Sequence, residues 1–390
     1  MPNESLSRSQ AVRFVWMIGL VSLLSDMTYQ GAHSNAGPYL ATLGASGTVV
    51  GLVAGAGEAV NLGLRLVFGY LTDRTRRHWL IAFFGYTLNL LTVPCLALTG
   101  SWPAAASLLI LERTGKGMRT PARDVMLSYA ADKMGRGRAF GIHEALDQTG
   151  AMLGPLLVAA MLFFHKGYRA SFAVLAVPAV LGLAMLAVTW ASYRSPEKLS
   201  NAAPELSTKN LPRPFWLLVT SVGCLAIGYA DFALMAFHFK QRAVLSAAWI
   251  PACYGIAMGL QGLSSFLSGR LFDRWGARTL LIAAVPAMAF TPLAFLGRAE
   301  WAFVGVALWA IGLGAQSTVM KAMVAGLVSA DRRGSAYGVL NCAYGALWFA
   351  GSAAMGWLYD RSLVALVIFS LVAQAAALPA LFSLANKKNG

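Results

Sequence analysis

Two aspartate–histidine pairs stand at matching places in the two halves of this sequence. Asp26 and His33 are seven residues apart in one apolar stretch, and Asp231 and His238 are seven apart in another. Seven residues make nearly two helical turns, so each Asp shares a helix face with its His, about 10 Å away. Together with Met235, these side chains are candidates for lining a substrate site. In the alternative interpretation, the Asp residues cap breaks in their helices and the His residues lie at an outer interface.

A second group of ionisable residues, mostly in the first half, could form a relay of protons or ion pairs. Glu112 and Lys116 are four residues apart and would neutralise each other on one helix face. Arg113 then needs another partner, and Glu58 and Asp147 are the candidates. The group either breaks and reforms its ion pairs in function, or is a static network that locks the helices together. The candidate relay comprises Glu58, Glu112, Arg113, Lys116, His143 and Asp147.

These charges are set in a chain that is 57% hydrophobic and only 12% charged. A soluble domain carries about a quarter charged residues, which cover its core. A helix needs about 20 apolar residues to cross about 30 Å of hydrocarbon. Runs of this kind predict an all-α membrane protein with twelve transmembrane helices, at 12–33, 48–69, 79–99, 102–119, 138–161, 169–191, 215–238, 248–268, 279–297, 301–322, 336–358 and 363–384.

The basic residues gather in alternate loops between these runs. If the N-terminus is cytoplasmic, twenty-one Lys and Arg residues lie in loops on that side and six on the other, with Arg119 and Arg123 counted among the twenty-one. This positive-inside bias predicts a multi-pass protein of the inner (cytoplasmic) membrane with both termini in the cytoplasm. The lipid bilayer therefore accounts for the net charge of +15, and no nucleic-acid partner is expected.

Two loop sequences recur about 200 positions apart. Gly69–Arg74 and Gly269–Arg274 share the pattern Gly-x-Leu-x-Asp-Arg, and Arg136–Gly141 matches Arg333–Gly338. The halves are therefore parallel repeats. We expect an N-terminal six-helix bundle over 1–191, a cytoplasmic linker over 192–214 and a C-terminal six-helix bundle over 215–390.

The Gly-x-Leu-x-Asp-Arg pattern in both loops resembles the signature loop of the major facilitator superfamily. The resemblance implies the major facilitator fold, in which Asp73 and Asp273, with Arg74 and Arg274, would gate the cytoplasmic side. The segment Glu112–Arg119, Glu-Arg-x-Gly-Lys-Gly-x-Arg, resembles a bacterial subgroup of that superfamily. One departure is Arg76, which occupies the usual glycine position of the first loop and puts the tightness of that turn in doubt.

A small-residue face, Gly150-x-x-x-Gly154 followed by Pro155, allows close helix approach and resembles the superfamily's antiporter motif. Taken together, the sequence predicts a proton-coupled secondary transporter that moves a small organic solute by alternating access, as a monomer and without a cofactor. The sequence does not predict an enzyme, because no nucleophile appears at a readable spacing from a general base and a residue that would orient that base. Two alternatives stay open: a copper-type metal-ion or metallophore transporter, and a non-transporting membrane receptor or assembly factor.

Overall fold

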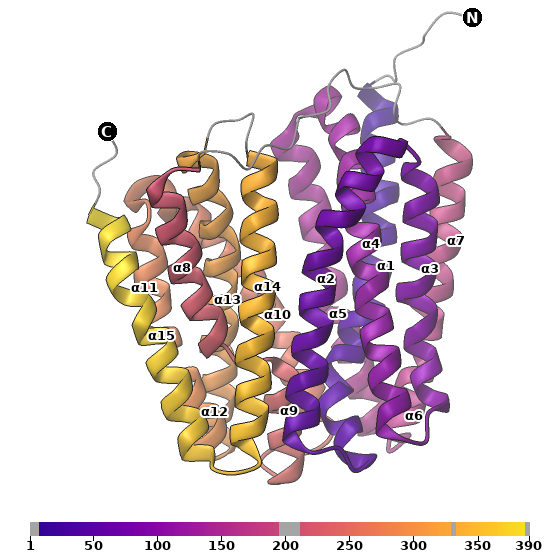
Figure 1. The fold of residues 1–390 in the computed structure, drawn as a ribbon. Coiled ribbons are helices and arrows are strands. Elements are labelled where there is room, and N and C mark those ends of the chain that lie inside the picture. Colours follow the sequence, from indigo (N-terminus) through magenta and orange to yellow (C-terminus); the bar gives the residue numbers. More distant parts are fainter. Residues whose placement is uncertain (1–7, 195–210, 329–332, 387–390) are drawn as a thin grey trace, which may run out of the picture. The chain divides into compact units, whose positions relative to one another are not determined.

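The structure, a computed structural model, describes residues 8–194, 211–328 and 333–386, and within these ranges not the side chains of residues 73, 131–133, 136–137, 333 and 334. Every regular element in this part of the chain is a helix (Figure 1). Most of the predicted linker, 195–210, lies outside the described residues. The first half contains α1 (Arg8–Thr42), α2 (Gly47–Thr75), α3 (His78–Cys95), the short 3-10 helix η1 (Leu96–Leu98), α4 (Trp102–Met134), α5 (Arg136–Phe163), α6 (Gly167–Val174) and α7 (Ala176–Ser192).

The second half also combines long helices with broken ones, although not all the breaks fall in matching crossings. It contains α8 (Arg213–Gly228), α9 (Phe232–Gln241), α10 (Trp249–Trp275), α11 (Arg278–Ala287), α12 (Phe290–Leu296), α13 (Ala299–Leu327), α14 (Arg333–Tyr359) and α15 (Leu363–Asn386). The elements α3 and η1, α6 and α7, α8 and α9, and α11 and α12 each form one crossing. The described residues thus make the twelve predicted crossings, ten of them long and apolar enough to span a membrane by length and composition.

Several helices extend well beyond the predicted apolar runs. The fourth crossing was expected to end at residue 119, but α4 continues to Met134 with Pro121 inside it. Membrane helices tolerate such a proline because neighbouring groups satisfy the freed backbone. Arg119 and Arg123 therefore lie on a helix, and counting them among the loop residues was wrong.

The chain forms two compact units, one with residues 1–33 and 60–203 and the other with residues 34–59 and 204–390. In the first unit α3 packs against α4 and α7, and a buried cluster includes Ile18, Tyr86 and Leu90. In the second unit α8 packs against α14 and α15, and α10 against α13, around a cluster that includes Leu218 and Val319. The end of α1 and the start of α2 thus group with the second unit. The division of the two bundles at the linker stays a prediction.

Large apolar side chains also cover the outside of both units. Phe84 on α3 is 63% exposed, Phe163 at the end of α5 69% and Val372 on α15 63%. Exposed apolar surface on this scale is unfavourable in water and is typical of helices that face lipid. The pattern agrees with the membrane location that the composition predicts.

The two repeated loops share a positive φ at the matching position after the helix. Gly276 follows α10 with a φ of 56°, and Arg76, at the matching position after α2, has a φ of 53°. Arg76 therefore adopts a φ that favours glycine.

Candidate functional site

One face of α4 carries a row of four cations, which we call the α4 cation row: Arg113, Lys116, Arg119 and Arg123. Their spacing of three, three and four residues puts them on one side of the helix. All four are buried or partly buried. A charge held inside a membrane protein must be paired or wetted, so the partners of this row define the candidate site.

Arg119 forms the most deeply buried ion pair of the row. Its side chain is 1% exposed, and Nη2 lies 3.3 Å from Oδ1 of Asp26 on α1. The hydroxyl of Tyr29 donates to the other carboxylate oxygen of Asp26 at 3.4 Å. The guanidinium group also lies 4.6 Å from the ring centroid of Tyr86 on α3. The charge is thus compensated by a carboxylate and by the negative face of an aromatic ring.

The two cations nearer the start of α4 also contact α1. Lys116 Nζ donates to the Tyr29 hydroxyl at 2.7 Å and lies 3.9 Å from the centre of that ring. Arg113 Nη2 lies 2.7 Å from Nδ1 of His33. Because a guanidinium group only donates, Nδ1 of His33 is the acceptor in this hydrogen bond.

Glu112 contacts a residue of α3 and its own neighbour on α4. Its Oε1 accepts a hydrogen bond from Asn89 Nδ2 on α3 at 2.6 Å, and its Oε2 lies 3.5 Å from Nε of the adjacent Arg113. Tyr29 thus contacts the lysine, and Asn89 contacts the glutamate. The i,i+4 pairing of Glu112 with Lys116 stays a prediction.

At the far end of the row, Arg123 meets one side chain of α5 and one of α1. Its Nη1 lies 3.6 Å from Oδ2 of Asp147, which also lies 3.6 Å from His143 Nδ1. The other ring nitrogen of His143 is 2.9 Å from the Ser22 hydroxyl, to which Arg123 donates at 3.4 Å. Asp124 adds a second carboxylate to Arg123 at 2.9 Å.

The cation that Asp147 contacts is therefore Arg123 and not the predicted Arg113. Ten residues separate the two arginines on α4, a rise of about 15 Å at 1.5 Å per residue. A carboxylate beside one cannot also reach the other. Glu58, partly buried on α2, belongs to the second unit, and its pairing with Arg113 stays a prediction.

Close backbone approach between α3 and α4 brings these side chains together. A Cβ atom at Gly85 would lie 2.6 Å from the backbone nitrogen of Arg119, and one at Gly115 would overlap the backbone of Asn89. Only glycine allows the helices to approach this closely. The same holds between α5 and α1, where Gly150 and Gly154 pack on the α1 backbone, so the predicted close approach of that face is confirmed.

In the second unit the candidate cavity residues lie around a helix break. The crossing that was expected to be continuous over 215–238 ends at Gly228 and resumes at Phe232. Asp231 caps the new helix by accepting from the Ala233 backbone at 2.8 Å. The capping alternative raised for Asp231 is therefore what the structure shows.

The other two candidate residues of α9 are buried beside this cap. His238 is 2% exposed and its Nδ1 lies 3.2 Å from the Tyr359 hydroxyl, while Met235 is fully buried. A shared site for Asp26, His33, Asp231, Met235 and His238 stays a prediction.

The predicted gating residues lie at the ends of α2 and α10. Arg74 is exposed and donates to the Tyr70 hydroxyl at 3.1 Å. Asp273 and Arg274 are exposed in the last turn of α10. The side chain of Asp73 lies outside the described residues, so the gating role stays a prediction.

Sequence reasoning missed several residues of the site. Arg123 was assigned to a loop, although continuing the three- and four-residue spacing past Pro121 would have found it. Ser22, Tyr86 and Asn89 carry no charge and show no distinctive spacing, so no pattern in the sequence indicates them. Within the described part of the chain, no group of three or more His, Cys, Asp or Glu side chains could hold a metal ion.

Twelve helical crossings, with ion pairs buried between them, define a polytopic α-helical membrane protein of the transporter type. The family model of the Major Facilitator Superfamily matches residues 17–352 and, in a second match, 243–389. The chain belongs to this superfamily, and it is a transporter with two six-helix bundles and not an enzyme. The predicted fold class is thereby confirmed.

Known proteins similar to this chain come from bacteria and archaea. An uncharacterised protein of Mycobacterium tuberculosis, Rv2265, is 41% identical over 381 residues, which cover 96% of this chain and 93% of the relative. An uncharacterised transporter of the same superfamily from Methanocaldococcus jannaschii, MJ1317, is 26% identical over 359 residues, 89% of each chain.

Among solved structures, a bacterial homologue of the human lysosomal transporter Spinster, in an inward-facing and unoccupied conformation, is similar in fold. Its TM-score is 0.76 over 96% of this chain and 97% of that chain, at 14% sequence identity. At this identity the likeness concerns the fold alone.

Proposed function

We propose that this protein is a proton-coupled secondary transporter that moves a small organic solute across the inner membrane by alternating access. The observation that carries the proposal is the buried contact of Asp26 with Arg119 and Tyr29. In this proposal the protein acts as a monomer. Both termini lie in the cytoplasm, as the charge distribution of the loops predicts.

Asp26 is the proposed proton-binding group. Asp26 is 8% exposed, and its carboxylate makes two long contacts, 3.3 Å to Arg119 on α4 and 3.4 Å to Tyr29 on its own helix α1. A proton on this carboxylate removes the negative charge that compensates Arg119. The uncompensated guanidinium group then favours binding of an electronegative group of the solute, which couples proton binding to solute binding.

The contact of Asp147 with both Arg123 and His143 supports a second protonation site on the same row. The carboxylate and the imidazole lie 3.6 Å apart. His143 contacts the Ser22 hydroxyl of α1, and Arg123, which contacts Asp147, donates to the same hydroxyl. A proton shared between them would change the charge next to Arg123 without exposing it to lipid. We therefore assign His143 and Asp147, together with Glu58, Glu112, Arg113 and Lys116, to the relay.

The remaining candidates complete the proposal on the other helices. Asp231, Met235 and His238 would contribute to the solute site from the second unit, because Asp231 lies at a helix break and the other two lie on the helix that starts there. The aspartates of the two repeated loops, Asp73 and Asp273, would gate the cytoplasmic side with Arg74 and Arg274.

Flux in proteoliposomes tests the proposal once a solute has been found by a thermal-shift screen at two pH values. Asp26→Asn should abolish accumulation driven by an imposed pH gradient, while solute exchange at equal pH persists, because the neutral side chain mimics the protonated state. Glu144→Gln is the matched control, since Glu144 is an exposed carboxylate of α5, and it should behave as the wild type.

Asp147→Asn and Glu58→Gln test the relay in the same assay. Each should change the pH dependence of uptake; an unchanged profile for both variants would remove the relay. Absence of any solute flux from active wild-type preparations would favour the receptor or assembly-factor alternative. Accumulation that depends on a metal ion would favour the metal or metallophore alternative.

A further inference from the structure

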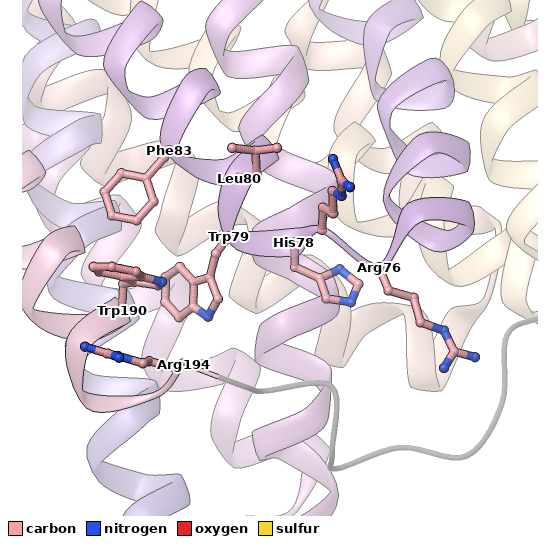
Figure 2. A pocket seen from close by; sticks show the side chains of 8 residues that line it. Arg76, His78, Trp79, Leu80, Phe83, Trp190 and Arg194 are labelled. Carbon is pink, nitrogen blue, oxygen red and sulfur yellow. The ribbon is translucent and has the colours of Figure 1, made fainter.

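A pocket of about 500 Å³ opens at the junction of α3 with the end of α7, outside the α4 cation row. It lies where the chain enters α3 from the first repeated loop. Eight residues line it: Arg76, Arg77, His78, Trp79, Leu80, Phe83, Trp190 and Arg194 (Figure 2). Three of the eight are arginines, and no acidic side chain is among these described lining residues.

The wall of the pocket is a set of aromatic rings held in place by packing. Trp79 is 8% exposed, and its indole nitrogen donates to the backbone oxygen of Tyr193 at 3.0 Å. The ring of Phe83 lies 6.4 Å from Trp79 and 5.9 Å from Trp190 between ring centroids, the latter in edge-to-face geometry. This wall is therefore preorganised and does not need a ligand to form.

The charged rim lies at the end of the helices and the apolar wall farther along them. Figure 2 shows Arg194 beside Trp190 and Trp79, Arg76 on the other side of His78, and Phe83 and Leu80 farther along α3. All three arginines are exposed. The Arg194 guanidinium lies 5.4 Å from the ring centroid of Trp190, so it remains beside the pocket.

An apolar strip continues from the pocket along the outside of α3. Leu80 is 48% exposed, Phe84 63% and Leu91 45%, spaced so that they share one face of the helix. In a membrane protein this strip faces acyl chains. Tryptophan side chains lie at the level of lipid headgroups, which puts the arginine rim at the depth of the phosphates.

From this arrangement we infer that the pocket binds an anionic glycerophospholipid, with its phosphate on Arg77, Arg194 and Arg76 and an acyl chain along the α3 strip. Guanidinium groups match phosphate oxygens in geometry and charge. Basic pockets between membrane helices on the cytoplasmic side are suited to anionic headgroups. The apolar strip favours a lipid over a soluble phosphate, because a soluble phosphate has no acyl chain to pack against the strip. The inference depends on membrane insertion and not on the proposed solute or proton coupling.

Native mass spectrometry of the purified full-length protein tests the assignment. Phosphatidylglycerol, cardiolipin and phosphatidylcholine are titrated separately, and the bound fraction is compared between variants. The wild type should bind both anionic lipids more tightly than phosphatidylcholine. Arg77→Gln/Arg194→Gln should weaken anionic-lipid binding by about tenfold and leave phosphatidylcholine unchanged. Arg77→Lys/Arg194→Lys, which keeps the charge, should retain the preference for anionic lipids.

The second repeat offers a matched control. Arg270→Gln/Arg278→Gln removes two exposed arginines from the corresponding loop region, one of them 4.1 Å from the ring centroid of Phe266. This variant should keep wild-type binding. An equal loss of anionic-lipid binding in the control variant would overturn the inference, and so would a wild type that shows no preference for anionic lipid. So would displacement of bound phosphatidylglycerol by millimolar glycerol 3-phosphate or inorganic phosphate, because the site would then recognise a free phosphate.

Discussion

At the scale of single residues, the protein keeps charges inside a lipid-embedded bundle by giving each one a specific partner. Asp26 and Arg119 are the clearest case, since both are nearly inaccessible and lie 3.3 Å apart. Such a pair contributes little net stability relative to two apolar residues. Removing one residue of the pair destabilises the fold, because the remaining charge stays buried without its partner.

A double-mutant comparison measures this coupling. Arg119→Gln should lower the thermal unfolding midpoint markedly, since removing one partner of a buried pair costs about 3–5 kcal/mol. Asp26→Asn/Arg119→Gln should recover much of that loss, because neither charge then remains. Arg138→Gln, an exposed arginine of α5, should change the midpoint little. If the double variant unfolds at the temperature expected from adding the two single losses, the two residues are not energetically coupled.

At the scale of elements, the end of one helix is held by a loop far away in sequence. Asp360, between α14 and α15, accepts hydrogen bonds from the backbone nitrogens of Gly47 and Thr48, each at 2.8 Å, and from the Thr48 hydroxyl. These groups form the start of α2, where backbone N–H groups have no helical acceptor. The loop thus caps a helix from the other half of the sequence.

This cap should be insensitive to pH near neutrality. Partial burial raises the pKa of Asp360, but the hydrogen bonds from Thr48, Gly47 and Ser46 together outweigh it and leave the pKa below the ordinary 3.8. A carboxylate with a lowered folded-state pKa stabilises the fold fully above its unfolded pKa and loses that stability as pH falls through the folded value. The contribution is therefore constant from pH 5 to 8 and is lost only below about 3.8.

Hydrogen exchange at the start of α2 checks the cap. Asp360→Asn should speed exchange of the Gly47 and Thr48 amides at pH 6, because the neutral side chain accepts these bonds less well. Asp273→Asn, a change in an exposed carboxylate at the end of α10, should leave them unchanged. Equal protection in the wild type and Asp360→Asn would show that the cap does not hold the helix.

At the scale of the whole molecule, the proposed alternating access requires helices of the two repeats to separate and close again. Helices α2 and α14 are in backbone contact in the second unit. A Cβ atom at Gly51 would overlap the carbonyl oxygen of Ser352 and lie 2.9 Å from Cα of Gly356. Contacts this close depend on small residues on both helices.

Gly51→Leu should therefore prevent this closure and abolish transport. The variant should still fold, because α2 is then displaced toward lipid and keeps its own hydrogen bonds. Gly63→Leu on the same helix is the control, since a Cβ atom there meets no described atom within 4 Å. Solute flux and the labelling of a cysteine introduced next to Ser352 report the outcome. Normal flux in Gly51→Leu would show that closure of α2 on α14 is not part of the cycle.

The sequence by itself determined the membrane class, the twelve crossings and the duplication, because these depend on patterns that are local or that recur at a fixed offset. Hydrocarbon thickness sets the length of each apolar run, and the repeated loops mark the two halves. The sequence also indicated that Asp26 and Glu112 are buried, since each lies in an apolar run, but it placed the buried Arg119 in a loop.

Only the tertiary structure decided which charges meet. Arg113 contacts His33, and Asp147 contacts Arg123, because α1 and α5 pack against α4 at heights that helical spacing does not specify. The close approach at Gly85 and Gly115 brings the backbones of α3 and α4 into contact, and Gly150 and Gly154 do the same for α5 and α1. Asp231, which shares its spacing with Asp26, caps a helix break. Identical spacing on two helices therefore gives different partners, since the partners come from the helices packed around them.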